Sequence, residues 1–480
     1  MVKLRFAGPV SSGLLTGVWA WWLASREPGP NVLSSREEEY LFLGRRPETN
    51  VGMGIVLVLS RCPVRSELVS TMEELCRSTP RLRQRVEALW KGFAGFRWVD
   101  VPDFDASKHV QYRIMEEDNG PMSALTTASS VISRDFDPDA PPWTLVILQG
   151  MLSGGAIAVL VLHHAIVDGD GLARLIAPML LPPGETAVVD RTIIGPPEGA
   201  VSPSRGGTLG LWGQRSARRL TQVSNSAVRI RAPNVPSKGC RSSVRRYIGR
   251  PRRRGSGPGA GRQLFAHSLE SASWKHAALQ RGAGVNELFV SVLACTLSRY
   301  FGFEGQSLRY VMPLSLRSFG RQVSGGNQSI DILAAVTAPQ HVPSDLKNLA
   351  RRHRELIHEQ VHAQRNANAA ANVVEAIVRL LPGSLQAQLL CRKYSQTDFV
   401  ASKVSAPAGL EMSGVSVNSM FGFTTTLGNP LTGVLAEGPL RTTLTLNIDL
   451  GQITETGRFC QGFREVLKEV FGSDAGELLV

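Results

Sequence analysis

The chain has 480 residues, which is more than one ordinary domain carries, so we expect two halves that each bury a core. A composition of 43% hydrophobic and 19% charged residues excludes a largely disordered protein, which needs fewer apolar residues and more charge. The formal net charge of +13 at pH 7 fits a nucleic-acid binder or a protein of the membrane surface, depending on where the charge lies. The cysteines are widely spaced and form no CxxC pair, which indicates buried thiols instead of a disulfide framework or a zinc site.

Residues 1–32 form an N-terminal apolar extension. Lys3 and Arg5 precede the stretch Gly13–Ala24, an order that resembles the basic and apolar regions of a signal peptide. No clear small-x-small cleavage site follows, and the stretch is shorter than a transmembrane helix requires. A surface helix, a signal and a membrane anchor therefore all remain open for this segment.

Residues 33–181 alternate between the period of a strand and the period of a helix, which predicts a first α/β subdomain. Met53–Ser60 is rich in β-branched residues and predicts a strand, and Val64–Arg77 has the spacing of a helix with one buried face. The further strands expected are 96–99, 111–115, 143–148 and 156–162, the last two joined by a Gly-rich hairpin. The further helices expected are 123–133 and 169–180.

Residues 182–262 are dominated by Pro, Gly, Ser and Arg and lack periodicity, which predicts an exposed linker. Within this linker, residues 201–262 contain 15 basic residues and no Asp or Glu, so the rest of the chain, with 38 basic and 40 acidic residues, is close to neutral. Only Trp212 and Tyr247 are aromatic here, whereas nucleic-acid-binding segments interleave aromatic with basic residues. The segment therefore favours contact with an anionic membrane over nucleic acid.

Residues 263–480 again mix helices and strands and predict a second α/β subdomain. The strands expected are 308–313, 331–338, 399–405, 415–421 and 441–449. The helices expected are 285–300, most of 343–380, and 458–471. The pattern thus predicts two α/β layers of comparable size, separated by a basic linker.

The sharpest local feature is His163-His164-Ala165-Ile166-Val167-Asp168-Gly169, which follows an apolar strand and precedes an amphipathic helix. A side chain at such a strand-to-helix turn commonly points into a cleft. His164 is a candidate general base, because a neutral imidazole accepts protons near neutral pH. Asp168 is expected to orient that ring or hold the turn, and Gly169 to supply a backbone angle that the turn needs. The alternative is a buried histidine pair followed by an aspartate that caps the next helix.

Several strings accompany this motif in a recognisable order. They are Pro80–Arg85 (PRLRQR), Trp98–Asp105 (WVDVPDFD), Pro141–Trp143, Asn286-Glu287 and Pro313–Arg317. With HHxxxDG, this order and spacing resembles the bacterial-type wax ester synthase/acyl-CoA:diacylglycerol acyltransferase (WS/DGAT) family, within the HHxxxD acyltransferase superfamily. The resemblance covers roughly residues 33–471, without much of the linker.

The resemblance implies an α/β fold of two chloramphenicol-acetyltransferase-like mixed-sheet subdomains, joined by the basic linker, with the active-site cleft between them. It implies an O-acyltransferase that moves a fatty acyl group from acyl-CoA to a long-chain alcohol or diacylglycerol, with no cofactor and no metal. His164 would take the proton from the acceptor hydroxyl, whose oxygen attacks the thioester. We expect a cytoplasmic protein that attaches peripherally to a membrane or lipid-droplet surface through residues 201–262.

The resemblance also assigns roles to single positions. The catalytic motif falls on His163, His164, Asp168 and Gly169. Asp168 is often structural in related enzymes, and Arg317 is its candidate partner. Pro142 and Trp143 occupy the family's PLW-type segment and are candidates for substrate binding, with core packing as the alternative for Trp143.

Two segments depart from the family's pattern. Asn286-Glu287 stands where the family has Asn-Asp; Asn286 is expected to donate a hydrogen bond to the oxyanion or to cap its helix. Glu287 extends the charge by one methylene, which disfavours a fixed salt bridge there. Ser402–Pro407 (SKVSAP) stands where the family often has TNVPGP. These departures predict another acceptor or low activity.

Two other functions stay open. One is a condensation-type acyltransferase of secondary metabolism that forms amides on carrier-bound substrates, which the PRLRQR and WVDVPDFD strings disfavour. The other is a catalytically weak homologue that binds lipid or membrane. The sequence contains no GxSxG, P-loop or HExxH motif that would support a different chemistry.

Overall fold

The structure is a computed structural model of the whole chain. It describes residues 35–44, 51–88, 96–115, 121–133, 135–150, 154–180, 261–315, 329–366, 396–406, 409–424, 428–472 and 478–479, with a few isolated positions besides. The apolar stretch 13–24 and nearly all of the expected linker lie outside these residues, so the predictions for them stay predictions.

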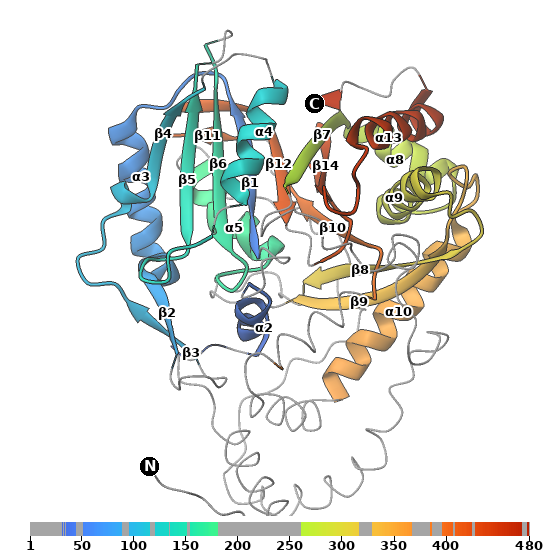
Figure 1. Cartoon of the computed structure of the whole chain (residues 1–480), viewed down its shortest axis with the longest axis horizontal. Helices are drawn as coiled ribbons and strands as arrows, with labels where there is room; N and C mark the ends of the chain where they lie inside the picture. Colours follow the sequence, from blue (N-terminus) through green and yellow to red (C-terminus); the bar gives the residue numbers. More distant parts are fainter. Residues whose placement is uncertain are drawn as a thin grey trace, which may run out of the picture.

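A six-stranded sheet forms the centre of the N-terminal subdomain, in the order β11-β12-β1-β6-β5-β4 (Figure 1). Its strands are β1 (Gly52–Leu59), β4 (Val110–Ile114), β5 (Trp143–Gln149), β6 (Ala156–His163), β11 (Glu411–Met412) and β12 (Val415–Thr424). β4 and β5 run parallel, whereas the other neighbours are antiparallel. The sheet is therefore mixed, as expected.

Helices cover both faces of this sheet (Figure 1). The helices of this subdomain are α2 (Ser35–Gly44), α3 (Arg65–Ser78), α4 (Pro121–Ile132) and α5 (Gly169–Leu180). Because successive strand residues point to opposite faces, Ile55 joins the core that contains Leu68 of α3 and Leu172 of α5. Its neighbour Val56 joins a second core with Leu125 of α4. The run MGIVLVL is apolar on both faces because both faces are covered.

A seven-stranded sheet forms the C-terminal subdomain, in the order β15-β7-β14-β13-β10-β8-β9. Its strands are β7 (Arg262–Glu270), β8 (Ser307–Ser315), β9 (Ser329–Thr337), β10 (Phe399–Ser405), β13 (Leu431–Glu437), β14 (Arg441–Asp449) and β15 (Leu478–Leu479). β10 is parallel to both β8 and β13, so this sheet is also mixed. The helices are α8 (Ser271–Gln280), α9 (Val285–Phe301), α10 (Lys347–Asn366) and α13 (Thr456–Phe471).

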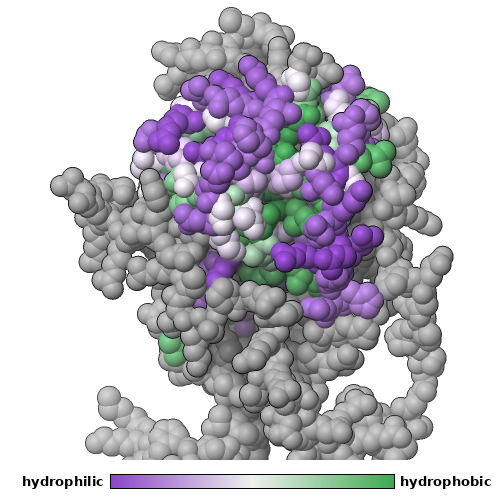
Figure 2. All heavy atoms as spheres, turned by 90° about the vertical axis from the view of Figure 1, so that its right-hand side faces the viewer, coloured by the Kyte–Doolittle hydropathy of each residue, from purple (hydrophilic) through white to green (hydrophobic). Residues whose placement is uncertain are grey.

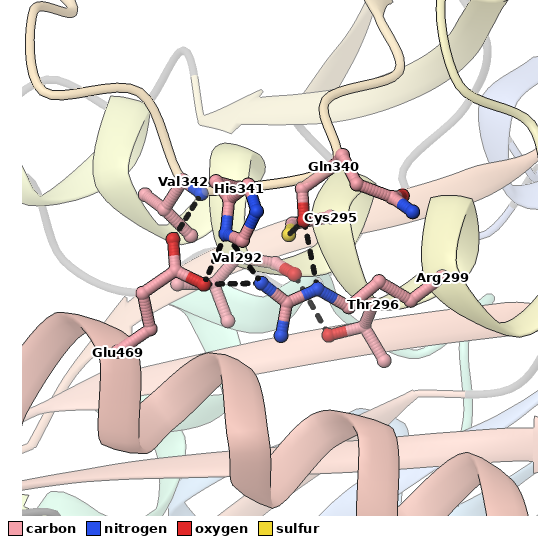
Figure 3. Close-up of polar contacts among 8 residues, drawn as sticks. All are labelled: Val292, Cys295, Thr296, Arg299, Gln340, His341, Val342 and Glu469. Carbon is pink, nitrogen blue, oxygen red and sulfur yellow. Dashed lines mark hydrogen bonds and ion pairs between the residues drawn. The ribbon is translucent and has the colours of Figure 1, made fainter.

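α9 is the central helix of the C-terminal core and is buried along most of its length. Gly433 of β13 allows this helix to approach the sheet, since a Cβ there would lie 2.8 Å from Cδ1 of Leu293. Figure 3 shows the polar contacts that fix the outer side of α9. Arg299 donates through Nε to the Gln340 carbonyl over 2.8 Å and forms an ion pair with Glu469 of α13. These contacts hold α9, α13 and the segment after β9 together.

β12 crosses from the C-terminal half of the sequence into the N-terminal sheet. It pairs antiparallel with β1, with Met53 opposite Thr424, although hundreds of residues separate the two strands. A small buried cluster also joins the two subdomains, and its members are Tyr40, Leu43, Val51, Val311 and Val400. β11 and β12 thus complete the first sheet from the second half of the sequence, and the expected division into residues 33–181 and 263–480 stays a prediction.

Two of the strings that carry the family resemblance build a small ribbon beside the first sheet. It consists of β2 (Gln84–Ala88) and β3 (Phe96–Asp100), flanked by the short 3-10 helices η1 (Pro80–Arg83) and η2 (Ala106–Lys108). The guanidinium of Arg81 lies 4.8 Å from the ring centre of Trp98. Gln84 donates to Asp100 over 3.2 Å. PRLRQR and WVDVPDFD therefore pack on each other.

Most elements expected from the sequence are confirmed within one to three residues. The elements that the sequence did not predict are α2, β2, β7, α8, β11, β13, β15 and the short 3-10 helices η1 and η2. The expected helix over most of 343–380 is confirmed as α10 up to Asn366, and the remainder lies outside the described residues.

The outer face of the C-terminal subdomain is largely hydrophilic, with hydrophobic residues visible between polar ones (Figure 2). α10 carries exposed charged residues, among them Arg351 and Glu355, which form an i,i+4 ion pair. Among the described residues, no helix has the length and apolar character needed to cross a membrane.

Candidate active site

The motif opens onto a cavity between the two subdomains. The N-terminal subdomain supplies His164, residues of β1 and residues of α5, whereas the C-terminal sheet supplies residues of β8, β9, β10 and β13. The apolar lining includes Met53, Ile55, Leu172, Ile176, Val311, Val400, Val404, Met420, Phe423 and Val434. The polar lining includes Tyr40, Asp168, Asp170, Ser315, Asp331, Ser402 and Lys403. A polar group with proton-transfer chemistry thus sits beside a surface suited to an aliphatic chain.

His164 is the first residue after β6 and is partly exposed in this cavity. Its backbone N–H donates to the Val51 carbonyl over 2.9 Å, which continues the ladder between β6 and β1 by one step. Its imidazole stacks on the ring of Tyr40, with 4.0 Å between ring centres and 2° between ring planes. The side chain is therefore held in one plane at the cavity wall.

His163 points the other way and is buried. Its Nδ1 accepts a hydrogen bond from the Ala165 N–H over 3.1 Å, and its ring meets the edge of Phe136. Burial, with a smaller contribution from the neighbouring His164, lowers the pKa of His163 from 6.5 to about 3. The first histidine of the motif is thus a neutral group that locks the turn, and it does not line the cavity.

Asp168 is the N-cap of α5. Its Oδ1 accepts a hydrogen bond from the Gly171 N–H over 2.7 Å, and its carbonyl accepts one from Leu172. The structure therefore shows the alternative interpretation of Asp168, in which this aspartate caps the next helix. Arg317, its candidate partner, lies outside the described residues.

Gly169 begins α5 without a positive φ, so the expected need for an unusual backbone angle is wrong. The reason for glycine is the close approach of β10, since a Cβ at this position would lie 3.2 Å from Cγ1 of Val404. Val404 also faces Gly422 of β12, whose added Cβ would lie 3.7 Å from Cγ2 of Val404. The two subdomains thus meet through Val404 beside the motif.

Ser402–Ser405 of the altered segment form the cavity-facing end of β10. Ala406 follows the strand, and Pro407 lies outside the described residues. Ser402, Lys403, Val404 and Ser405 all line the cavity. Lys403 forms an ion pair with Glu437 of β13. The departure from the family's pattern therefore falls directly on the wall of the cavity.

Asn286 lies in the first turn of α9 and does not line the cavity. The expected cap at Asn286 is wrong, because Gly284 is the N-cap and its N–H donates to Glu287 over 2.9 Å. The expectation that Glu287 lacks a fixed partner is also wrong. Its other carboxylate oxygen lies 2.8 Å from Nδ1 of His353, whose Nε2 contacts the hydroxyl of Tyr310. Burial opposes ionisation of Glu287, but the contact with His353 and the backbone N–H groups outweigh it and lower its pKa.

Trp143 and Pro142 lie outside the cavity lining. Trp143 is buried, donates through Nε1 to the Leu82 carbonyl over 2.8 Å, and stacks on His109 with 4.6 Å between ring centres. The Pro142 carbonyl accepts from the His163 N–H over 2.9 Å. Both residues thus connect the PRLRQR string to the strand that carries the histidines, and their expected role in substrate binding stays a prediction.

Sequence reasoning missed Tyr40 and the β12 residues Met420, Gly422 and Phe423, which all line the cavity. Nothing in the local sequence marks them, because they reach the motif only through long-range packing. The described residues contain no group of three or more His, Cys, Asp or Glu side chains that could hold a metal ion.

Comparison with known proteins gives this arrangement a family. The model of the wax ester synthase/diacylglycerol acyltransferase catalytic domain matches residues 46–289, just over half of the chain, including the motif. The chain belongs to the WS/DGAT family. Membership makes it an acyltransferase, and acyltransferases of this family use acyl-CoA as a substrate.

Individual relatives agree with the WS/DGAT assignment. A protein of Mycobacterium tuberculosis that carries the provisional name diacylglycerol O-acyltransferase is 24% identical over 455 residues, covering 88% of each chain. The solved wax ester synthase/diacylglycerol acyltransferase of Marinobacter aquaeolei superposes with a TM-score of 0.55 at 16% identity, covering 91% of this chain and 98% of that one. The condensation domain of the monacolin K polyketide synthase also gives 0.55, at 12% identity and 94% and 99% coverage. The two-subdomain chloramphenicol-acetyltransferase-like fold is confirmed.

Proposed function

We propose that this chain transfers a fatty acyl group from acyl-CoA to a lipophilic hydroxyl, either a long-chain alcohol or diacylglycerol, with His164 as the general base. The observation that carries the proposal is the position of His164. It is the histidine of the motif that reaches the cavity between the subdomains, whereas His163 is buried and holds the turn.

The reaction balances without a cofactor. The neutral imidazole of His164 takes the hydroxyl proton as the acceptor oxygen attacks the thioester carbonyl. The tetrahedral intermediate collapses, the carbon–sulfur bond breaks, and the CoA sulfur receives the proton from the imidazolium. The products are an oxygen ester and free CoA, and His164 returns to its neutral form.

The apolar wall supports aliphatic substrates. Ile55, Ile176, Met420 and Phe423 line the same cavity as His164, and burial of each substrate methylene against such a wall contributes about 0.8 kcal/mol. An acyl or alkyl chain of fatty-acid length would gain several such contributions. Small polar acceptors would gain none, which favours lipophilic ones.

Other residues of the motif keep His164 in place in this proposal. Asp168 and His163 shape the turn, and Gly169 admits β10. Arg317 remains a candidate partner for Asp168. Asn286 does not line the cavity, so its expected hydrogen bond to the oxyanion stays a prediction. The segment Ser402–Ser405 lines the cavity, so we expect its departure from the family's pattern to alter the choice of acceptor.

The test is an acceptor panel with radiolabelled palmitoyl-CoA and the purified full chain. Hexadecanol, a sterol, dipalmitoylglycerol and hexadecylamine are supplied separately. We expect ester formation with at least one hydroxyl acceptor. Amide formation from hexadecylamine alone would favour the condensation-type alternative, and lipid binding without any product would favour the catalytically weak homologue.

We propose further that residues 201–262 attach the enzyme to anionic lipid, at a membrane or a lipid-droplet surface, with residues 13–24 as a candidate second contact. The support is the charge of the sequence, 15 basic residues and no acidic one, at about 1 kcal/mol for each basic residue near such a surface. Flotation with phosphatidylserine vesicles should exceed flotation with phosphatidylcholine vesicles and fall with salt. Equal flotation with both lipids would contradict this attachment.

A further inference from the structure

Tyr40 is the closest aromatic neighbour that the structure shows for the candidate base. Its ring lies parallel to the His164 imidazole, with 4.0 Å between ring centres and 2° between planes. Tyr40 itself is 3% exposed, so its ring is fixed by packing. One face of a rigid aromatic ring therefore covers one face of the imidazole.

The helix that carries Tyr40 is anchored at two levels. Glu38 accepts a hydrogen bond from the Phe96 N–H over 3.1 Å, and the Leu33 N–H donates to the Phe96 carbonyl over 3.0 Å. Tyr40 and Leu43 then pack in the buried cluster that joins the two subdomains, together with Val51, Val311 and Val400. Both the helix and the seam between the subdomains thus set where the ring of Tyr40 lies.

We propose that Tyr40 is a positioning residue that holds the imidazole of His164 in its plane and stabilises the imidazolium formed during proton transfer. The face of an aromatic ring carries partial negative charge and attracts a cation placed over it. His164 becomes such a cation when it takes the proton from the acceptor. This inference rests on the proposed role of His164 as the base and adds a residue to it.

Other charged residues line the same cavity as the imidazole and must stay constant in any test. Those lining the cavity are Asp168 and Asp170 of the α5 end, Asp331 of β9 and Lys403 of β10, with His163 next to His164 in the chain. The carboxylates favour an imidazolium and Lys403 opposes it, although Glu437 partly balances Lys403. A change at Tyr40 keeps all of these residues in the chain, and comparison of Tyr40→Phe with Tyr40→Leu separates the hydroxyl from the ring.

The direct test is an NMR titration of the full chain with ring-13C-labelled histidine, in which the His164 signal is identified by its loss in His164→Gln. Tyr40→Phe keeps the ring and removes the hydroxyl, whereas Tyr40→Leu keeps an apolar side chain and removes the ring. We expect the pH of half-protonation of His164 to fall by roughly 0.5–1 pH unit in Tyr40→Leu and to stay unchanged in Tyr40→Phe. Leu43→Ala, in the same cluster, is the matched control for loosened packing and should not move this titration. Tyr40→Met replaces Tyr40→Leu if the latter does not fold.

A kinetic measurement accompanies the titration. The acid limb of the pH–rate profile should move to lower pH by the same amount in Tyr40→Leu, with kcat lowered about tenfold or more and KM for acyl-CoA nearly unchanged. The proposal would be overturned if His164 were half-protonated at the same pH in Tyr40→Leu as in the unchanged chain. It would also be overturned if Tyr40→Phe and Leu43→Ala shifted that pH as much as Tyr40→Leu does. If neither the unchanged chain nor any variant forms ester, the proposed function fails. The titration of His164 still decides the role of Tyr40 in that case.

Discussion

Asp168 caps α5 through a 2.7 Å hydrogen bond from the backbone N–H of Gly171. The same aspartate is buried and lies four residues after His164, so the cap fixes the far end of the turn that brings His164 to the cavity. Its place in the motif is thereby explained by helix geometry, because an N-cap side chain satisfies a backbone donor that the helix itself leaves open.

Replacement of Asp168 should separate the cap from the charge. Asp168→Ala removes the acceptor for the Gly171 N–H and should lower the free energy of unfolding by about 1–2 kcal/mol, with a loss of acyl transfer as the turn loosens. Asp168→Asn keeps a capping oxygen and should retain most of the stability. Urea denaturation and the acyl-transfer assay check both variants. If Asp168→Asn lost as much stability and activity as Asp168→Ala, the carboxylate charge, and not the cap, would be required.

The strands and helices around the motif could be predicted because their signals are local. β1 and β6 are apolar runs of β-branched residues, and α5 has a helical period that begins at a cap residue. β13 was not predicted because Gly433 interrupts its strand pattern. The same glycine allows α9 to pack on the strand.

The parts of the site that could not be predicted depend on long-range contacts. Tyr40 lies on a short helix with three consecutive glutamates and no clear amphipathic period, and only the tertiary fold brings it onto His164. The pairing of β12 with β1 is likewise invisible in local sequence. The motif could be predicted from the sequence, whereas Tyr40 and the β12 residues that line the cavity with it could not.

The contact between Gly169 and Val404 predicts a compensating pair of substitutions. Gly169→Ala places a methyl 3.2 Å from Cγ1 of Val404 and should cost about 1–3 kcal/mol of stability through overpacking. Val404→Ala removes that methyl contact, so the double variant should recover part of the loss. Unfolding free energies of the four chains give the coupling, and strictly additive effects would contradict a direct contact.

The buried His163 predicts a specific dependence of stability on pH. Its pKa falls from 6.5 to about 3 on folding, so below 6.5 the unfolded chain binds a proton that the folded chain does not. The contribution of neutral His163 is therefore complete above pH 6.5 and is lost as the pH falls toward 3. Relative to His163→Gln, the unchanged chain should lose about 1.4 kcal/mol for each pH unit in the middle of this window. Parallel pH dependences for the two chains would show that His163 titrates normally in the folded state.

A substitution of Trp143 distinguishes a role in core packing from a role in substrate binding. Trp143→Phe removes the donor to the Leu82 carbonyl and should lower the free energy of unfolding by about 1–3 kcal/mol, while KM for acyl-CoA stays the same. Denaturation and steady-state kinetics on the same preparations decide the matter. A raised KM at unchanged stability would instead place this ring in contact with substrate.

The central claim is that His164 is the base, and the most direct measurement is kcat for ester formation by His164→Gln. The matched control is His276→Gln, since His276 is an exposed histidine on α8, outside the cavity. We predict a loss of about 10²–10⁴-fold in His164→Gln, with unchanged unfolding, and no loss in His276→Gln. Ester formation by a folded His164→Gln at the rate of the unchanged chain would contradict the account.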